Sequence, residues 1–254
     1  MLNAEFLEIW SDVHGIFTAD PSRIPTARLI RHLGYREAQE MAALGAKVLH
    51  PRCVGVAARA GVPLVLRSTD DPGREGTRVE SASEDHPVVT AVTCRRGVTL
   101  LSISTLDMWE QPGYLARLFA PFEALGFSID LLATSESAVS LTLDAIPGGL
   151  DGRPFADLLT RLGRMGRVRV VRDCAVVSIL GRRIRAALSE IGSALEVFRE
   201  RPVHLLTDSA EDLNLSFVVD QPDADTLVEK LHTRLFAGRG DDPRLGPTWD
   251  MLQA

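Results

Sequence analysis

The chain has 254 residues, of which 45% are hydrophobic and 24% are charged, a composition typical of a folded protein with room for two or three small domains. Its formal net charge of −6 argues against the basic surface that nucleic acids and anionic membranes attract. No apolar run approaches the ~20 residues that span a bilayer. The start, MLNAEFLEIW, lacks the basic and apolar blocks of a signal peptide.

The three cysteines, Cys53, Cys94 and Cys174, are far apart and odd in number. Such spacing gives neither a metal site nor a disulfide framework, so we expect a reducing, cytoplasmic location. Each cysteine is expected to be a small core residue rather than a nucleophile.

The first region, residues 1 to about 67, has helix-like patterning with an apolar stripe through Leu29, Leu33, Ala38, Met41 and Leu44. We expect this helix to end near Gly45 and the element to stop at His50 and Pro51. A short strand, VPLVLRS (62–68), closes the region. The polar stretch 69–87 is rich in turn formers and predicts a loop and linker. Lys47 has two readings, a surface lysine or a cation that holds a phosphate.

The last region contains a repeat. FSIDLLATSESAVSLTLD (127–144) and VHLLTDSAEDLNLSFVVD (203–220) each show an apolar strand, a polar turn and an alternating strand. In the alternating strands, apolar residues recur at every second position, which puts them on one face of a sheet. The positions are Val139, Leu141 and Leu143 in the first copy, and Leu213, Leu215 and Phe217 in the second.

Amphipathic helices surround each copy. GYLARLFAPFEALG and PFADLLTRLG flank the first, and IRAALSEIGSALEVFRE and ADTLVEKLHTRLF flank the second. With the preceding strands VTLLSIST and DCAVVSIL, the order strand, helix, strand, strand, helix recurs at about 75 residues, which is the ferredoxin-like pattern. The strand PVVTAVTC (87–94) is spare and is assigned to the sheet of the second copy.

Several of these stretches together resemble the aspartate kinases. WSDVHGIFTADP (10–21) looks like the nucleotide-binding loop of that family, ALGAKVLHPR (43–52) matches its helix-end motif, and VPLVLRSTDDPGREGTRV (62–79) is similar to the segment that leaves the kinase domain. Residues 106–144 resemble the effector-binding module of the lysine-sensitive branch. The resemblance is to the C-terminal part of the family, with its paired ACT regulatory domains. It implies an α+β or α/β chain in which a truncated amino-acid-kinase piece precedes two ferredoxin-like modules.

The resemblance implies four nucleotide-binding residues, Ser11, Asp12, Phe17 and Lys47. A compact ammonium suits a polyphosphate, which is the physical reason for a lysine there. The loop departs from the family at His14, Ala19 and Ser22. The family's Gly-rich phosphate-binding segment, K-F-G-G-T-S, is not found in this sequence. We therefore expect no cofactor in this chain, with ATP and Mg²⁺ bound in a full-length parent, and we name no catalytic residue.

An effector site is expected where Pro112 and Gly113 begin a helix, because free N–H groups at a helix start attract a carboxylate. Asp130 and Glu136 could hold the ammonium groups of an amino acid. From spacing alone, each is more often a strand-edge or solvated turn residue. The resemblance favours the functional reading and implies a lysine site formed by Met108, Gly113, Tyr114, Leu115, Asp130, Ser135 and Glu136. Tyr114 and Leu115 could equally be packing residues.

The expected divisions are residues 1–80 for the kinase piece and linker, 88–170 and 171–236 for the two modules, and 237–254 for a tail or a linker into a fused enzyme. The implied function is the regulatory and partly catalytic portion of an aspartate kinase, which phosphorylates L-aspartate with ATP, with L-lysine binding at the first module. Alone the chain is expected to be inactive and to be completed by its other half in cis or in trans. The alternative is a non-catalytic dimerisation module without an amino-acid ligand. If the effector is not lysine, threonine is the next candidate. The expected partners are L-lysine and a second copy of the chain, paired through the ACT modules, with neither nucleic acid nor membrane.

Overall fold

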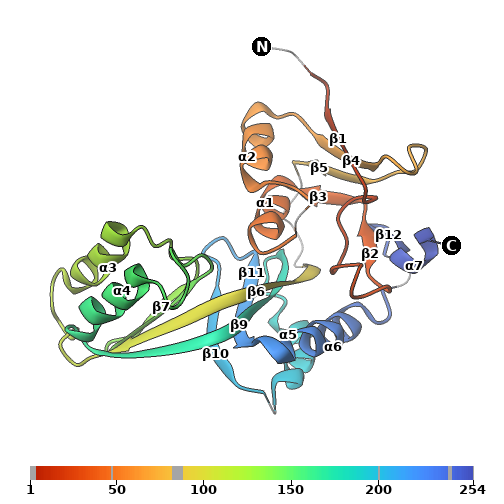
Figure 1. The fold of residues 1–254 in the computed structure, drawn as a ribbon. Coiled ribbons are helices and arrows are strands. Elements are labelled where there is room, and N and C mark those ends of the chain that lie inside the picture. Colours follow the sequence, from red (N-terminus) through yellow and green to blue (C-terminus); the bar gives the residue numbers. More distant parts are fainter. Residues whose placement is uncertain (1–3, 47, 82–87, 200, 240–241, 254) are drawn as a thin grey trace.

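The computed structural model describes residues 4–46, 48–81, 88–199, 201–239 and 242–253 (Figure 1). Two sheets carry the fold, one of four strands near the N-terminus and one of six strands. A two-stranded sheet joins β2 (Arg28–Ile30) near the start of the chain to β12 (Leu245–Thr248) near its end.

The four-stranded sheet has the order β1-β4-β5-β3. Its strands are β1 (Leu7–Ser11), β3 (His32–Gly34), β4 (Leu64–Ser68) and β5 (Thr77–Glu80). β1 and β4 run parallel, so that Ser11 and Ser68 lie side by side at their carboxyl ends. β5 lies inside the stretch predicted to be a loop. That prediction is wrong because Thr77 and Val79, both fully buried, alternate in a strand too short to stand out among turn residues.

Two helices accompany this sheet. α1 (Tyr35–Ala43) ends before Gly45, as predicted. α2 (Pro51–Ala60) begins at the proline that was expected to stop the element. A proline is tolerated in a first helical turn because the N–H that it lacks would have had no partner there. His50 caps α2, since its Nδ1 accepts a hydrogen bond from the Arg52 N–H at 3.2 Å.

The six-stranded sheet has the order β10-β11-β9-β6-β8-β7. Two long strands, β6 (Val88–Ser104) and β9 (Arg167–Arg182), pair antiparallel along nearly their whole length. One hairpin, β7 (Leu132–Thr134) and β8 (Ala138–Leu143), pairs with one half of β6. The other hairpin, β10 (Val203–Asp208) and β11 (Asn214–Asp220), pairs with the opposite half of β9. Both hairpins agree with the predicted repeat.

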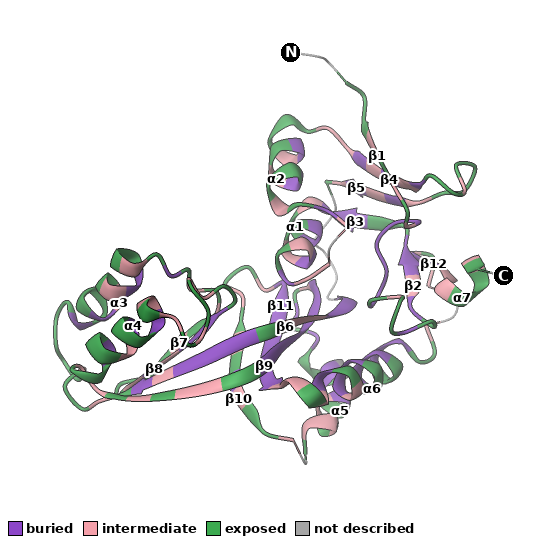
Figure 2. Ribbon diagram, in the orientation of Figure 1, coloured by how far each residue is buried: buried purple, intermediate pink, exposed green. Residues whose placement is uncertain are grey.

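The helices gather at the two ends of these long strands (Figure 1). α3 (Tyr114–Leu125) and α4 (Arg153–Gly163) pack on the β8 half around a buried cluster that includes Leu118, Phe155 and Leu141. α5 (Leu188–Ala194), the 3₁₀ turns η1 (Leu195–Phe198) and η2 (Gln221–Asp223), and α6 (Ala224–Phe236) accompany the β11 half. The outer faces of α3 and α4 are exposed (Figure 2). The amphipathic stretches therefore form helices as predicted.

The expected fold class, a truncated kinase piece followed by two separate ferredoxin-like modules, is wrong. PVVTAVTC and VTLLSIST were expected to be two strands, but they form one uninterrupted strand, β6. DCAVVSIL is likewise only one half of the long strand β9. The two copies therefore share a single sheet. The spare strand lies where it was assigned, because Val88–Arg96 pairs with the Ala175–Arg182 half of β9.

The segment expected to be a tail or linker packs onto the body of the protein. Its β12 strand pairs with β2, and the guanidinium of Arg28 donates hydrogen bonds to the backbone oxygens of Gly246 at 2.9 Å and Arg239 at 2.6 Å. In α7 (Trp249–Gln253), the Trp249 ring meets the Phe17 ring edge-on at 5.4 Å. The described part of this segment thus covers the loop that follows β1.

The first 80 residues and the β11 half of the large sheet share one hydrophobic core. The cluster runs from Ile16 and Leu29 through Val92 and Ile179 to Leu231. Because both parts bury their apolar side chains in the same cluster, a displacement of one part disturbs the packing of the other.

Candidate ligand-binding pocket

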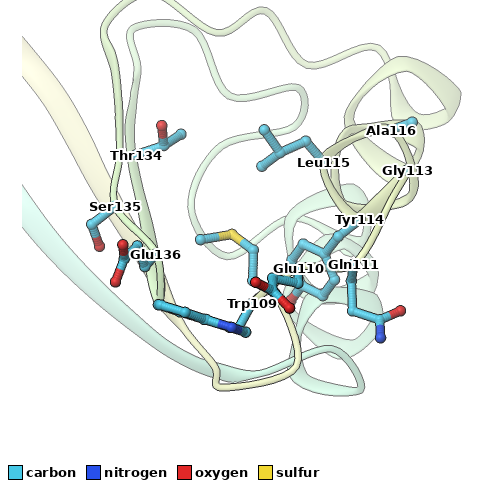
Figure 3. A pocket seen from close by; sticks show the side chains of 11 residues that line it. Trp109, Glu110, Gln111, Gly113, Tyr114, Leu115, Ala116, Thr134, Ser135 and Glu136 are labelled. Atoms are coloured by element: carbon cyan, nitrogen blue, oxygen red, sulfur yellow. The ribbon is translucent and has the colours of Figure 1, made fainter.

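A pocket of about 500 Å³ opens at the start of α3. Its walls come from three chain segments, as Figure 3 shows: the loop before α3, the first turn of α3, and the end of β7 with the turn that follows. The lining residues are Met108, Trp109, Glu110, Gln111, Gly113, Tyr114, Leu115, Ala116, Thr134, Ser135 and Glu136.

The local sequence explains these walls. Gly113 precedes α3 with a left-handed φ of 73°, a conformation that favours glycine and lets the chain turn sharply into the helix. Across the pocket, the β7–β8 hairpin turn is closed by a 2.8 Å hydrogen bond from the Ser135 N–H to the Ala138 oxygen. That turn presents Glu136 on the side opposite the helix start (Figure 3).

All charged side chains that line the pocket are acidic. Glu110 and Glu136 contribute two carboxylates, and none of the lining residues is basic. The first turn of α3 contributes backbone N–H groups, which favour an anion through the helix dipole. The pocket therefore combines an anion-binding end with a cation-binding end, and this combination fits an amino acid that carries a second ammonium group.

Six of the seven predicted effector residues line this one pocket. They are Met108, Gly113, Tyr114, Leu115, Ser135 and Glu136. Tyr114 also has a packing role, since it is 5% exposed and its hydroxyl donates to the Met165 oxygen at 3.0 Å. Five further lining residues were not among the predicted effector residues: Trp109, Glu110, Gln111, Ala116 and Thr134. Their proximity to the predicted residues in the same loops was the available signal.

Asp130 is the exception, because it does not line the pocket. Its carboxylate lies 3.8 Å from the guanidinium of Arg95, on β6, and accepts a hydrogen bond from the Asp144 N–H at 3.2 Å. Arg95 also pairs with Asp144. Burial raises the pKa of Asp144 to about 6, and the neighbouring Asp130 carboxylate adds to the rise while Arg95 opposes it. In this structure Asp130 is part of an ion cluster rather than a wall of the pocket.

The predicted nucleotide residues lie in the loop that follows β1. Ser11 ends β1, and Asp12 is exposed directly after it. Phe17 is only 5% exposed and packs against Trp249, so its ring belongs to the core rather than to an open site. Lys47 lies outside the described residues.

The described residues offer neither a metal site nor a cysteine with a lowered pKa. Among them, no group of three or more His, Cys, Asp or Glu side chains is arranged to hold a metal ion. Burial raises the pKa of both Cys94 and Cys174 to about 11, which keeps these thiols protonated near neutral pH. Cys53 is exposed, contrary to the core position expected for it.

Comparison with known proteins shows a specific likeness. Residues 1–68 match the amino acid kinase family. The chain is 36% identical to lysine-sensitive aspartokinase 3 of Escherichia coli, over 92% of this chain and 53% of that protein. It is 32% identical to the chloroplastic aspartokinase 2 of Arabidopsis thaliana, over 91% of this chain and 44% of that protein. The chain thus spans about half the length of these relatives.

Solved structures give the same result. The crystal structure of E. coli aspartokinase III in complex with aspartate and ADP superimposes with a TM-score of 0.82, at 35% identity, over 92% of this chain and 53% of that one. The complex of the same enzyme with lysine and aspartate gives a TM-score of 0.79, at 36% identity, with the same coverage.

These findings correct the assignment of the chain to the C-terminal regulatory part of an aspartate kinase. Residues 1–68 match the amino acid kinase family, and the chain aligns over 92% of its length with an aspartokinase solved with aspartate and ADP. The expected function, a regulatory portion built from ACT modules, is therefore also wrong. The described residues include no helix with the length and apolar character needed to cross a membrane. Over nine-tenths of its length the chain is similar to aspartokinases, with its amino acid kinase match in residues 1–68.

Proposed function

We propose that this chain is part of an aspartate kinase, which transfers the γ-phosphoryl group of ATP to the β-carboxylate of L-aspartate. The observation that carries the proposal is the position of Ser11 and Asp12. They lie at the carboxyl end of β1, beside its parallel neighbour β4, within the segment that matches the amino acid kinase family. In open α/β sheets, ligands bind outside the carboxyl ends of the strands.

The residues at these strand ends fit a nucleotide with Mg²⁺. Ser11 and Thr69 carry hydroxyls and Asp12 an exposed carboxylate, oxygen groups of the kind that hard cations and their bound waters prefer. ATP supplies the γ-phosphoryl group when it is bound. In the transfer, a carboxylate oxygen of aspartate forms a bond to the γ-phosphorus, the bond to the bridging oxygen breaks, and ADP leaves with that electron pair. Here Ser11 and Asp12 would orient the polyphosphate.

The pocket at the start of α3 is proposed to bind L-lysine. The α-carboxylate would lie at the helix start, near Gly113, and the ammonium groups would face Glu110 and Glu136. Threonine has a single ammonium and a hydroxyl, so it would leave one of these carboxylates without a cationic partner. This preference is supported by the E. coli relative, which has been solved with lysine and aspartate.

A homodimer is part of the same proposal. β7 lies at an edge of the six-stranded sheet, beside the pocket, and Leu132 on it is 43% exposed. An edge strand offers unpaired backbone groups to a second copy. Light scattering should give twice the chain mass for the wild type, and a shift to the single-chain mass in Leu132→Lys.

The test uses the full polypeptide that contains this sequence. ADP release should require both aspartate and Mg-ATP, and Asp12→Asn should lower the turnover by at least tenfold. In a calorimetric titration, L-lysine should bind saturably to the wild type and to Glu123→Gln, an exposed change on the same helix. It should bind at least tenfold more weakly to Glu136→Gln. Turnover without aspartate would refute the proposed reaction, and equal lysine affinity in the two variants would refute the pocket.

A further inference from the structure

Thr18 is a fully buried junction in the loop that follows β1. Its backbone N–H donates to the backbone oxygen of Arg28 at 2.9 Å, and its backbone oxygen accepts from the Val92 N–H at 2.8 Å. Its hydroxyl oxygen accepts from the Arg28 N–H at 2.9 Å and is hydrogen-bonded to Nε2 of His232 at 2.8 Å. A single residue thus joins the loop to β2, β6 and α6.

His232 reaches this loop from α6. The side chain is buried, with 3% of the residue exposed, and its ring stacks on Phe236 at 4.8 Å. Burial lowers the pKa of His232 to about 4, so the imidazole is neutral near pH 7. A neutral imidazole has one donor and one acceptor nitrogen, and Nε2 satisfies its requirement with the Thr18 hydroxyl.

The same helix holds the loop at a second point. Arg23 Nη1 lies 2.7 Å from both carboxylate oxygens of Asp225, which also pairs with Arg96 on β6. Asp225 and His232 are seven residues apart, about two helical turns, so both face the same side of α6. The helix α6 therefore holds the loop at two residues, Thr18 and Arg23.

A packed segment connects Thr18 to Asp12. Between the two residues, the Ile16 N–H donates to Thr77 Oγ1 at 2.8 Å. Gly15 is packed so closely that a Cβ there would come within 2.5 Å of the same hydroxyl. A tightly packed segment of this kind moves as a unit, so a shift at Thr18 would displace the residues at the end of β1.

We propose that Thr18 and His232 are positioning residues: through their hydrogen bond, α6 holds the loop 12–23 in the conformation that binds the nucleotide. The effect on nucleotide binding rests on the proposed function. The attachment of the loop to α6 does not depend on that function. Neither side chain touches the nucleotide in this proposal, and both act through the backbone that carries Asp12.

The test compares Thr18→Val with Thr18→Ser in the full polypeptide. Valine keeps the shape but removes the hydroxyl and leaves His232 Nε2 without its partner, whereas serine keeps the bond. In Thr18→Val, the KM for ATP should rise about tenfold, whereas the KM for aspartate should not change. Amide hydrogen exchange in residues 12–23 should become faster. Thr18→Ser should match the wild type in each measurement.

A stability control, Leu162→Val, and a second test variant, Asp225→Asn, separate positioning from general stability. Leu162→Val removes buried volume from the distant α4 cluster and should lower the melting temperature without changing the KM for ATP or exchange in the loop. Asp225→Asn weakens the exposed contact with Arg23 and should raise the KM for ATP about threefold. It replaces Thr18→Val if that variant does not fold.

The outcomes are distinct. Unchanged loop exchange in Thr18→Val, or an ATP effect equal to that of Leu162→Val, would overturn the positioning role. A wild type that neither binds nor turns over ATP would refute the proposed function and the nucleotide part of this inference. Loop exchange would then decide whether α6 positions the loop.

Discussion

The Asp144 N–H donates a hydrogen bond to Oδ2 of Asp130 at 3.2 Å, which brings two partly buried carboxylates together beside Arg95. Burial raises the pKa of Asp144 from 3.8 to about 6. A raised folded-state pKa favours the protonated carboxyl. The contribution of Asp144 to the free energy of unfolding is therefore complete below pH 3.8 and is lost as the pH rises through about 6.

Asp144→Asn should remove this dependence. An amide resembles the protonated carboxyl, so the variant should gain stability relative to the wild type between pH 4.5 and pH 7.5. The gain should be about 1–3 kcal/mol, from a shift of about two pKa units. Urea unfolding at the two pH values measures it, with the exposed Asp151→Asn as control. Parallel curves for wild type and Asp144→Asn would contradict the shifted pKa.

His232 should give the opposite dependence. Its folded-state pKa is depressed from 6.5 to about 4, so its contribution is complete above pH 6.5 and is lost as the pH falls towards 4. The difference in unfolding free energy between wild type and His232→Gln should shrink by about 3 kcal/mol from pH 7 to pH 4. The exposed His32→Gln serves as control. A constant difference across this range would mean that His232 titrates normally in the folded state.

Glu37 joins α1 to the large sheet. Its side chain is 6% exposed, accepts from Thr90 Oγ1 at 2.7 Å and from the Gly34 N–H at 3.1 Å, and lies 3.3 Å from Arg182 Nε. Removing one partner of a buried ion pair costs about 3–5 kcal/mol. We expect Glu37→Ala to destabilise the protein by about 3 kcal/mol, and Glu37→Gln by less because the amide still caps α1.

Urea unfolding checks this prediction, with the exposed Glu229→Gln as control. A loss of less than about 0.5 kcal/mol in Glu37→Ala, the usual range for surface changes, would show that the first 80 residues and the sheet do not depend on this contact.

The local elements were predictable because their signals are local. A 3.6-residue period predicted α3, α4 and α6, and alternation predicted that Val139, Leu141 and Leu143 would be buried on one face of β8. Most of the pocket residues were found for the same reason, since they lie in two short loops next to these elements.

What failed depends on long-range pairing. The run Arg95-Arg96-Gly97 and the pair Arg172-Asp173 look like breaks between strands, but the strands continue through them with register shifts and a left-handed Asp173 at φ 53°. Bulges of this kind keep a strand paired while its local pattern changes. Asp130 was misplaced because its partner Arg95 is distant in the sequence and no local pattern reports such a contact.

Trp249 should stabilise the loop after β1 by packing its ring against that loop. Its ring meets Phe17 at 5.4 Å and His14 at 6.0 Å, both edge-on, and the segment that carries it is held by the β12–β2 pairing. Trp249→Ala removes this aromatic contact and part of the cover over Phe17. We expect a loss of about 2 kcal/mol, below the 3–5 kcal/mol of a fully buried aromatic because Trp249 is only half-buried. Trp249→Phe should recover most of the loss, and Met251→Ala, an exposed change in the same helix, should cost little. Urea unfolding measures the three variants, and an equal loss in Trp249→Ala and Met251→Ala would mean that α7 does not stabilise the loop through its aromatic ring.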